Sequence, residues 1–434
     1  MCQYSRVRRL GFMALAVMVL GAVVGVSSGL LRLLLVLVER FMMGYAESPS
    51  ASGPLVVPPL RRVVSVSVGC TVAAAVWWLL RTRTKKVPSV AQAVDGRTMP
   101  GWQTTVHVLL QIFIVGSGAS IGREVAPREF GAMLGQRFAK VFRLTDHDRR
   151  LIVAVAAAAG LAGVYAAPLA GTFFAVEILL TDVTGQTVAL ALGTSAVSAW
   201  SAGLIGGRGV FYDMSGLGRA GLPPLSLSVF AVACGVFAGL MGTAFRAGSQ
   251  WAGSHQPQGV SIVWMLPLAA LATGVVAIWL PEVMGNGRSV AQHAFSVPGH
   301  ASVAALLMLV GLLVAKIVLT LATIRSGASG GVLQPGISIG ATLGAILGLA
   351  WAFMVPGSSV TACALVGAAA LLAASQQAPL MAMCLVMELT QAPMAYFVPV
   401  GLAVALSMMV SKIVQIGFSQ WRRRAVRKTD RTVV

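Results

Sequence analysis

One acidic and one basic residue stand side by side in a stretch of otherwise small and apolar residues. The stretch is SGASIGREVAP at 117–127, in which Arg123 precedes Glu124. A carboxylate at an anion-binding site acts as a tethered anion, which competes with the free ion and leaves the site when it is protonated. We therefore identify Glu124 as a candidate gate or proton carrier. A salt bridge with Arg123 is the alternative, although adjacent helical residues do not face each other.

The elements expected to position Glu124 are helix N-termini. A second run, SGASGGVLQP at 326–335, repeats the first without the ion pair. In each run Gly and Ser let a ligand approach the backbone, and Pro suits the first turn of a helix. That turn has unpaired N–H groups and a partial positive charge, so two such N-termini facing each other would form one anion site. Close helix packing through small residues is the alternative.

The two runs belong to a longer repeat. Pro168 and Glu177 are nine residues apart, and so are Pro379 and Glu388. The SGAS runs are offset by 209 residues and the Pro–Glu elements by 211. Because two ordered elements recur at a nearly constant offset, we predict two structural repeats, in which Glu177 and Glu388 have a shared structural role near helix ends.

The composition indicates a membrane protein. Of 434 residues, 57% are hydrophobic and only 10% are charged, whereas soluble domains have about a quarter charged residues. Apolar stretches recur from 10–38 to 395–418, and several are too short or too rich in Gly to be simple spans. Irregular backbone persists at membrane depth only where protein buries it or water lines it. The predicted fold class is an all-α polytopic membrane protein of tilted and broken helices. Among the acids, only Glu124, Glu177 and Glu388 are expected at membrane depth.

The predicted organisation has five parts. These are a cytoplasmic N-terminus at 1–9, membrane repeat 1 at 10–206, an inter-repeat linker at 207–221, membrane repeat 2 at 222–418 and a basic cytoplasmic tail at 419–434. The net charge of +19 comes from basic clusters at the ends of apolar segments. Such clusters mark cytoplasmic sides and place both termini inside, so we do not attribute the charge to nucleic-acid binding. The five cysteines and five histidines show no metal-ligand or disulfide spacing, and no cofactor is expected.

Several motifs resemble those of one known family. GREVAP at 122–127 resembles the G(K/R)EGP signature of the CLC chloride channels and chloride/proton antiporters. GVLQP at 331–335 resembles the GxFxP signature of that family, and AAPLAGTFFAVEIL at 166–179 and GNGRS at 285–289 resemble further stretches. The resemblance runs in order over roughly residues 10–420 and is greatest to the divergent ClcB-like bacterial branch. It implies two inverted-topology repeats, a homodimer with one pore per subunit, and a bacterial inner membrane location.

The resemblance also implies roles for individual residues. Glu124 matches the external gating glutamate of the family. The backbone amides of Val332 and Leu333 match groups that coordinate the anion. The remaining anion-binding candidates are the other residues of these signatures, Gly122, Val125 and Gly331.

The sequence departs from the family pattern at three further positions. Lys85, within TKKVP, stands where a GSGIP motif would supply a serine to the anion. An ordinary cytoplasmic charge is the alternative interpretation of this lysine. Tyr396 is the only tyrosine near the place of the pore tyrosine, but counting from Glu388 and from Pro399 gives different registers. Ile178 aligns with the inner proton-transfer glutamate of the antiporters.

The expected function is therefore passage of chloride or a similar small anion through a pore gated by Glu124, as a channel or as an anion/proton antiporter. Chloride, protons and membrane lipid are the expected partners. A fluoride-exporting CLC-type transporter is the first alternative. An intramembrane enzyme is the second, but it needs a nucleophile and base or metal ligands at membrane depth. The sequence shows no HExxH motif and its histidines are scattered, so no enzyme activity is expected.

Overall fold

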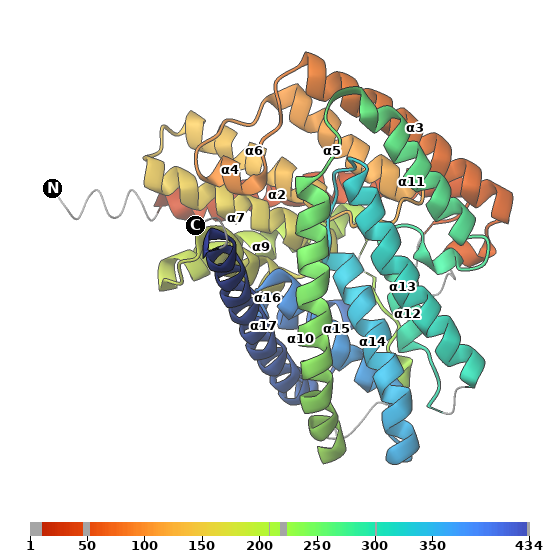
Figure 1. Ribbon diagram of the computed structural model, residues 1–434. Coiled ribbons are helices and arrows are strands. Elements are labelled where there is room, and N and C mark those ends of the chain that lie inside the picture. Colours follow the sequence, from red (N-terminus) through yellow and green to blue (C-terminus); the bar gives the residue numbers. More distant parts are fainter. Residues whose placement is uncertain (1–10, 47–52, 208, 218–223, 300–301, 432–434) are drawn as a thin grey trace.

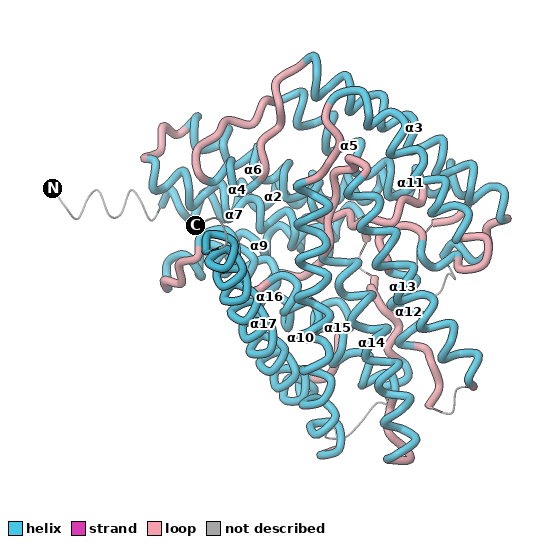
Figure 2. The backbone as a smooth tube through the Cα atoms, viewed as in Figure 1, coloured by secondary structure: helices cyan, strands magenta, loops and turns pink. Residues whose placement is uncertain are grey.

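The computed structural model describes residues 11–46, 53–207, 209–217, 224–299 and 302–431, and from 419 onwards it describes the backbone alone. Across these residues the chain is helical, and its β-type pairing is a single antiparallel bridge between Gly122 and Gly331 (Figure 2). The predicted all-α class is confirmed. The predicted N-terminal segment 1–9 and part of the predicted linker lie outside the described residues.

Eight of the described helices are long and apolar enough to cross a membrane. They are Gly11–Met43, which contains α2 (Gly21–Val38); α3 (Pro59–Arg83); α9 (Gly185–Gly206); α10 (Leu225–Ser254); Gly259–Val276, which contains α11 (Ile262–Val276); α13 (Val303–Arg325); α14 (Leu333–Met354); and Met394–Phe418, most of which belongs to α17 (Phe397–Arg431). Figure 1 shows α10, α13, α14 and α17 side by side, and α11 against α3. The chain is therefore a multi-pass membrane protein.

Shorter helices fill the interior between these spans. They are α4 (Val90–Val94), α5 (Gly101–Gly116), α6 (Val125–Val141), α7 (Asp146–Tyr165), α8 (Pro168–Phe173), α12 (Arg288–Phe295), α15 (Val360–Gln376) and α16 (Pro379–Thr390). Helices α7 and α15 consist largely of buried Ala and Gly, and they pack against α6 and α14. A Cβ at Gly135 would lie 2.8 Å from Ala156, and one at Gly344 would lie 2.9 Å from Ala364. Small residues therefore bring these helix pairs close together.

Unusual backbone conformations recur in the two halves. Gly118 and Gly327, 209 residues apart, have φ values of 107° and 100°. Ala166 and Gln377, 211 residues apart, have φ values of 52° and 58° where α7 and α15 end. Left-handed backbone is uncommon for residues other than glycine, so its recurrence at the same offset shows that the halves share local geometry. The exact boundaries of the repeats stay a prediction.

Two glutamates join the halves reciprocally. Glu177, which follows α8, accepts hydrogen bonds of 3.1 and 2.8 Å from two N–H groups in the first turn of α16. Glu388, near the end of α16, accepts two bonds of 2.9 Å from N–H groups in the first turn of α8. Each glutamate thus satisfies otherwise unpaired backbone donors at the helix N-terminus of the other half. Reciprocal contacts of this kind are those that a two-fold relation produces.

We expect Glu177→Ala and Glu388→Ala each to lower the free energy of unfolding by about 2–3 kcal/mol, because each leaves two helix-terminal N–H groups without a charged acceptor. Thermal unfolding of the detergent-purified protein measures the loss. The control is Asp182→Ala, which removes an exposed carboxylate five residues after Glu177. Equal stability of Glu177→Ala and Asp182→Ala would contradict the bridging role.

Candidate functional site

The two SGAS runs meet at one point in the interior. The N–H of Gly122 donates to the carbonyl of Gly331, and the N–H of Gly331 donates to the carbonyl of Gly122, both at 2.8 Å. Immediately after this bridge, Glu124 precedes α6 and Leu333 begins α14. A Cβ on Gly331 would collide with the Glu124 carboxylate, so glycine at this position leaves room for that side chain. The bridge therefore holds the start of α6 beside the start of α14.

The Glu124 side chain reaches across the bridge to the opposite helix. Its Oε1 accepts a 2.6 Å hydrogen bond from the backbone N–H of Leu333, in the first turn of α14. Its Oε2 accepts a 3.2 Å hydrogen bond from the hydroxyl of Tyr165, at the end of α7. The Glu124 side chain is fully buried. A carboxylate therefore lies where the unpaired N–H group and the dipole of α14 favour an anion.

Arg123 packs against two aromatic rings, and no ion pair between it and this carboxylate is found among the described residues. Its guanidinium lies 5.7 Å from the ring centroid of Tyr165 and 5.6 Å from that of Phe211. Its Nε has no hydrogen-bond partner among the described residues. The basic group that contacts Glu124 is Arg128, whose Nε donates to the Glu124 backbone carbonyl at 2.8 Å. The alternative interpretation of Glu124 as the salt-bridge partner of Arg123 is therefore not what the side chains show.

Two cavities are lined by residues close to the Glu124 site. The Arg123 cavity, of about 160 Å³, is lined by Arg123, Tyr165 and Phe211 among others. The Arg81 cavity, of about 460 Å³, is lined by residues that include Arg81 and Ser329. Tyr165 donates to Glu124, and Ser329 lies two residues before the bridging Gly331, so the Glu124 site lies between the two cavities. Basic side chains in both cavities attract anions toward it.

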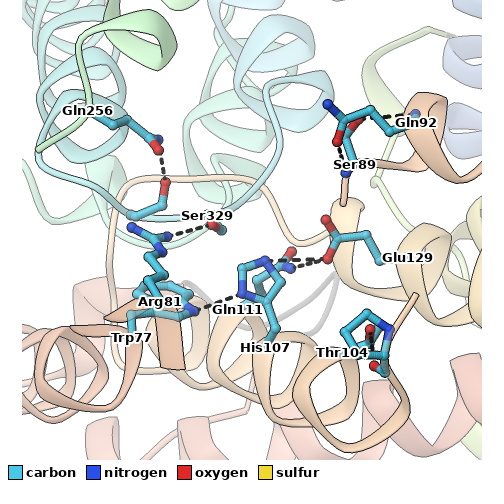
Figure 3. A network of polar contacts seen from close by, with 12 residues as sticks. Trp77, Arg81, Ser89, Gln92, Thr104, His107, Gln111, Glu129, Gln256 and Ser329 are labelled. Carbon is cyan, nitrogen blue, oxygen red and sulfur yellow. Dashed lines mark hydrogen bonds and ion pairs between the residues drawn. The ribbon is translucent and has the colours of Figure 1, made fainter. Parts of the chain in front are cut away.

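Polar side chains from three helices form the wall of the Arg81 cavity (Figure 3). Arg81 donates to the hydroxyl of Ser329 at 3.0 Å, and its guanidinium lies 5.4 Å from the ring centroid of Trp77. Trp77 Nε1 donates to His107 Nδ1 at 3.0 Å, and His107 Nε2 lies 3.6 Å from Glu129 Oε2. The chain of contacts runs from α3 through α5 to α6, the helix that Glu124 precedes.

Comparison with known proteins identifies the family of this arrangement. The family model described as voltage gated chloride channel matches residues 71–412. The matched range contains the glycine bridge, Glu124 and the start of α14. This chain belongs to the voltage-gated chloride channel family. The family is one of channels rather than of enzymes, so the comparison gives the alternative of an intramembrane enzyme no support.

Relatives and solved structures agree with this family. The chain is 32% identical over 357 residues to "Voltage-gated ClC-type chloride channel ClcB" of Citrobacter koseri, covering 76% of this chain and 80% of the relative. It is 34% identical over 336 residues to "Putative chloride channel protein ClcB-like" of Ralstonia nicotianae, covering 74% and 75%.

Among solved structures, a slow cyanobacterial Cl⁻/H⁺ antiporter has a TM-score of 0.75 at 22% identity, covering 92% of this chain and 95% of that one. A CLC-type fluoride/proton antiporter has a TM-score of 0.67 at 19% identity, with the same coverage. At these identities the structures show the fold alone, and the predicted CLC-like fold class is confirmed.

Most of the residues proposed from sequence lie together in this member of the chloride channel family. Leu333 and Glu124 are hydrogen-bonded, and Val332 precedes Leu333 at the N-terminus of α14. The bridge pairs Gly122 with Gly331, and Val125 begins α6 directly after Glu124. Their assignment to anion binding stays a prediction, since the group at this position is the Glu124 carboxylate.

Two proposed residues lie elsewhere. Lys85 is exposed and lines the Arg81 cavity. No direct contact between Lys85 and Glu124 is found among the described residues. The hydroxyl of Tyr396 donates to the carbonyl of Leu217 at 3.3 Å. Tyr396 also lines a separate small cavity together with Trp351. The structure therefore does not bring Tyr396 to the glycine bridge.

The expectation that only three acids lie at membrane depth stays a prediction, because burial inside the protein does not measure depth in a membrane. Glu39, Glu129 and Glu282 are also buried. Glu129 escaped notice because α6 contains several charged residues, so its sequence does not read as apolar. Of the expected three, Glu177 and Glu388 are only partly buried, since their carboxylates reach the first turns of α16 and α8.

Sequence reasoning also missed two polar groups, one beside Glu124 and one beside the first SGAS run. Tyr165 directly precedes the AAPLAG stretch, and a lone tyrosine in an apolar run was the available signal. Lys316 on α13 is fully buried and donates to the hydroxyl of Ser120 at 3.0 Å and to the carbonyl of Gly285 at 2.9 Å. Lys316 thus places a positive charge beside the first SGAS run. Charges buried at membrane depth are costly and usually functional.

We expect Tyr165→Phe to tighten anion binding about tenfold, because the Glu124 carboxylate loses one of its two hydrogen bonds and competes less well for the N–H of Leu333. Calorimetric titration of the purified protein with chloride as the probe anion measures this change. Tyr396→Phe is the comparison and should leave the affinity unchanged. If Tyr396→Phe shifts the affinity and Tyr165→Phe does not, the pore tyrosine is Tyr396, as the sequence suggested.

Proposed function

We propose that this protein moves chloride or a similar small anion across a membrane through a passage gated by Glu124. One observation supports the proposal above all others. The carboxylate of Glu124 occupies the N-terminus of α14, a position that suits a free anion, and it does so between two cavities lined by basic residues. A tethered anion in that position excludes a diffusing one until it leaves.

Protonation supplies the means of leaving. A neutral carboxyl group has a weaker interaction than a carboxylate with the N–H of Leu333 and with the dipole of α14. A chloride ion then replaces the carboxylate at the N–H of Leu333 and the N-terminus of α14. It enters from the cavity that contains it. The same exchange carries one proton on Glu124, so the site is compatible with a channel and with an anion/proton antiporter. Two of the similar solved structures are anion/proton antiporters, which favours the second by analogy of fold.

The proposed location is the bacterial inner membrane, with both termini in the cytoplasm. The Arg81 cavity then faces the cytoplasm, because Lys85 and Lys86 line it. The loop after α4 lies near the same side, since Asp95 approaches Arg150 at the start of α7 to 3.9 Å. The bacterial relatives support this location.

Lipid contact and dimerisation complete the proposal. Large apolar side chains are exposed along the spanning helices, for example Leu33, Val72 and Val314, as expected of surfaces that face lipid tails. A homodimer with one passage per subunit rests on membership of the chloride channel family alone.

We expect chloride efflux from liposomes to rise severalfold as the pH falls in the wild-type protein, because protonation removes the Glu124 carboxylate from the N-terminus of α14. In Glu124→Gln the efflux should be independent of pH. A chloride electrode measures both, with Asp182→Asn, an exposed acid, as the control.

Unchanged efflux and unchanged pH dependence in Glu124→Gln would show that Glu124 is not the gate. The same liposomes loaded with fluoride separate the alternative ion. Fluoride efflux in the absence of chloride efflux would replace the proposal with a fluoride exporter.

A further inference from the structure

The Arg81 cavity contains a second buried carboxylate that the gate does not use. Glu129 lies on α6 five residues after Glu124 and is 7% exposed, and it lines the cavity together with His107. Its Oε2 accepts a 2.6 Å hydrogen bond from Gln111 Nε2, and no hydrogen bond to Oε1 is found among the described residues. In Figure 3 the carboxylate faces the space between Ser89 and His107. Acids at membrane depth are costly and usually belong to ion or proton paths.

The partners of Glu129 fix its chemistry. Because Trp77 Nε1 can only donate, His107 Nδ1 is the acceptor of that bond, and the proton of the neutral ring lies on Nε2. Nε2 is the nitrogen 3.6 Å from Glu129 Oε2. Gln111 and His107 thus both present donors to the charged form of Glu129, whereas burial favours the neutral form. These opposed influences suit a group that binds and releases a proton.

A second polar atom in the cluster is unpartnered. Gln111 is fully buried, and its Oε1 has no donor among the described residues. The Arg81 cavity, of about 460 Å³, is lined by Glu129 and His107, and it has room for water that can deliver protons to Glu129.

Charged groups on neighbouring elements lie near Glu129. Arg81 on α3 and the lysines Lys85 and Lys86 line the same cavity. Arg128 on the same helix interacts electrostatically with both Glu124 and Glu129. The positive charges of these side chains favour the ionised form of Glu129, and they disfavour protonation of His107. Glu129 is thus the group in the cluster that accepts the proton.

We propose that Glu129, held by His107 and Gln111, is the proton-loading site that connects the Arg81 cavity with Glu124. A proton passes from cavity water to the Glu129 carboxylate, and from there to the Glu124 carboxylate when that side chain leaves Leu333. Glu129 lies five residues after Glu124, about 7.5 Å along the helix axis, and Arg128 interacts with both carboxylates. The transfer needs no other reactant. This inference rests on the proposed anion transport.

The test is simultaneous measurement of chloride and proton flux in liposomes, with a chloride gradient and no initial proton gradient. In the wild type we expect protons to move against their equilibrium as chloride flows. In Glu129→Gln we expect chloride flux within about twofold of wild type and proton movement reduced at least tenfold. Asp95→Asn, which removes an exposed acid 3.9 Å from Arg150, should keep the wild-type proton-to-chloride ratio.

Each outcome decides between claims. Chloride flux without proton movement in the wild type overturns the inference and leaves the gated anion passage intact, as does an unchanged ratio in Glu129→Gln. Absence of chloride flux in the wild type overturns the proposed function itself.

A second variant covers misfolding of Glu129→Gln. Gln111→Leu keeps Glu129 but removes the 2.6 Å donor to its charged form. The carboxyl band of Glu129 in infrared difference spectra should then titrate roughly one pH unit higher than in the wild type. An unmoved band, or a band that does not titrate in the wild type, contradicts the assignment.

Discussion

The 2.6 Å hydrogen bond between the Glu124 carboxylate and the N–H of Leu333 is the contact on which the site depends. It forms only because the Gly122–Gly331 bridge brings the starts of α6 and α14 together. Glycine at 331 leaves room for the carboxylate, and the small residues of α7 and α15 let α6 pack closely on α7 and α14 on α15. The fold thus converts two distant sequence runs into one anion-sized position.

The protein uses one physical device three times, with two different results. Glu177 and Glu388 each bind two backbone N–H groups at a helix N-terminus of the other half, and these contacts hold the two halves together. Glu124 binds a single backbone N–H and the hydroxyl of Tyr165, and it lies between two cavities. A carboxylate with fewer donors and an accessible competitor can be exchanged. The difference between structure and gating therefore lies in the number of donors and in the space around them.

Much of this site could be predicted from the sequence, because its parts are local. The SGAS runs, the Pro–Glu spacing, GREVAP and GVLQP are short patterns. They identified Glu124, Leu333, Glu177 and Glu388. Tyr165, Arg81 and His107 could not be found in this way, since they reach the site through the packing of α7, α3 and α5. Glu129 was hidden by the charged neighbours on α6, which lower the apolar character that signals burial. The sequence did not assign a role to Tyr396, because helix lengths between matched motifs vary. Counting from Glu388 and from Pro399 therefore gave two registers.

The central claim is that the Glu124 carboxylate occupies an anion site. Anomalous diffraction from crystals soaked in bromide tests it directly, because bromide is a heavy substitute for chloride. Our account predicts a bromide peak within hydrogen-bonding distance of the Leu333 N–H in Glu124→Gln, and no peak there in the wild type while the carboxylate is in place. Bromide absent from that position in Glu124→Gln, or bound there beside an unmoved Glu124 in the wild type, would contradict it.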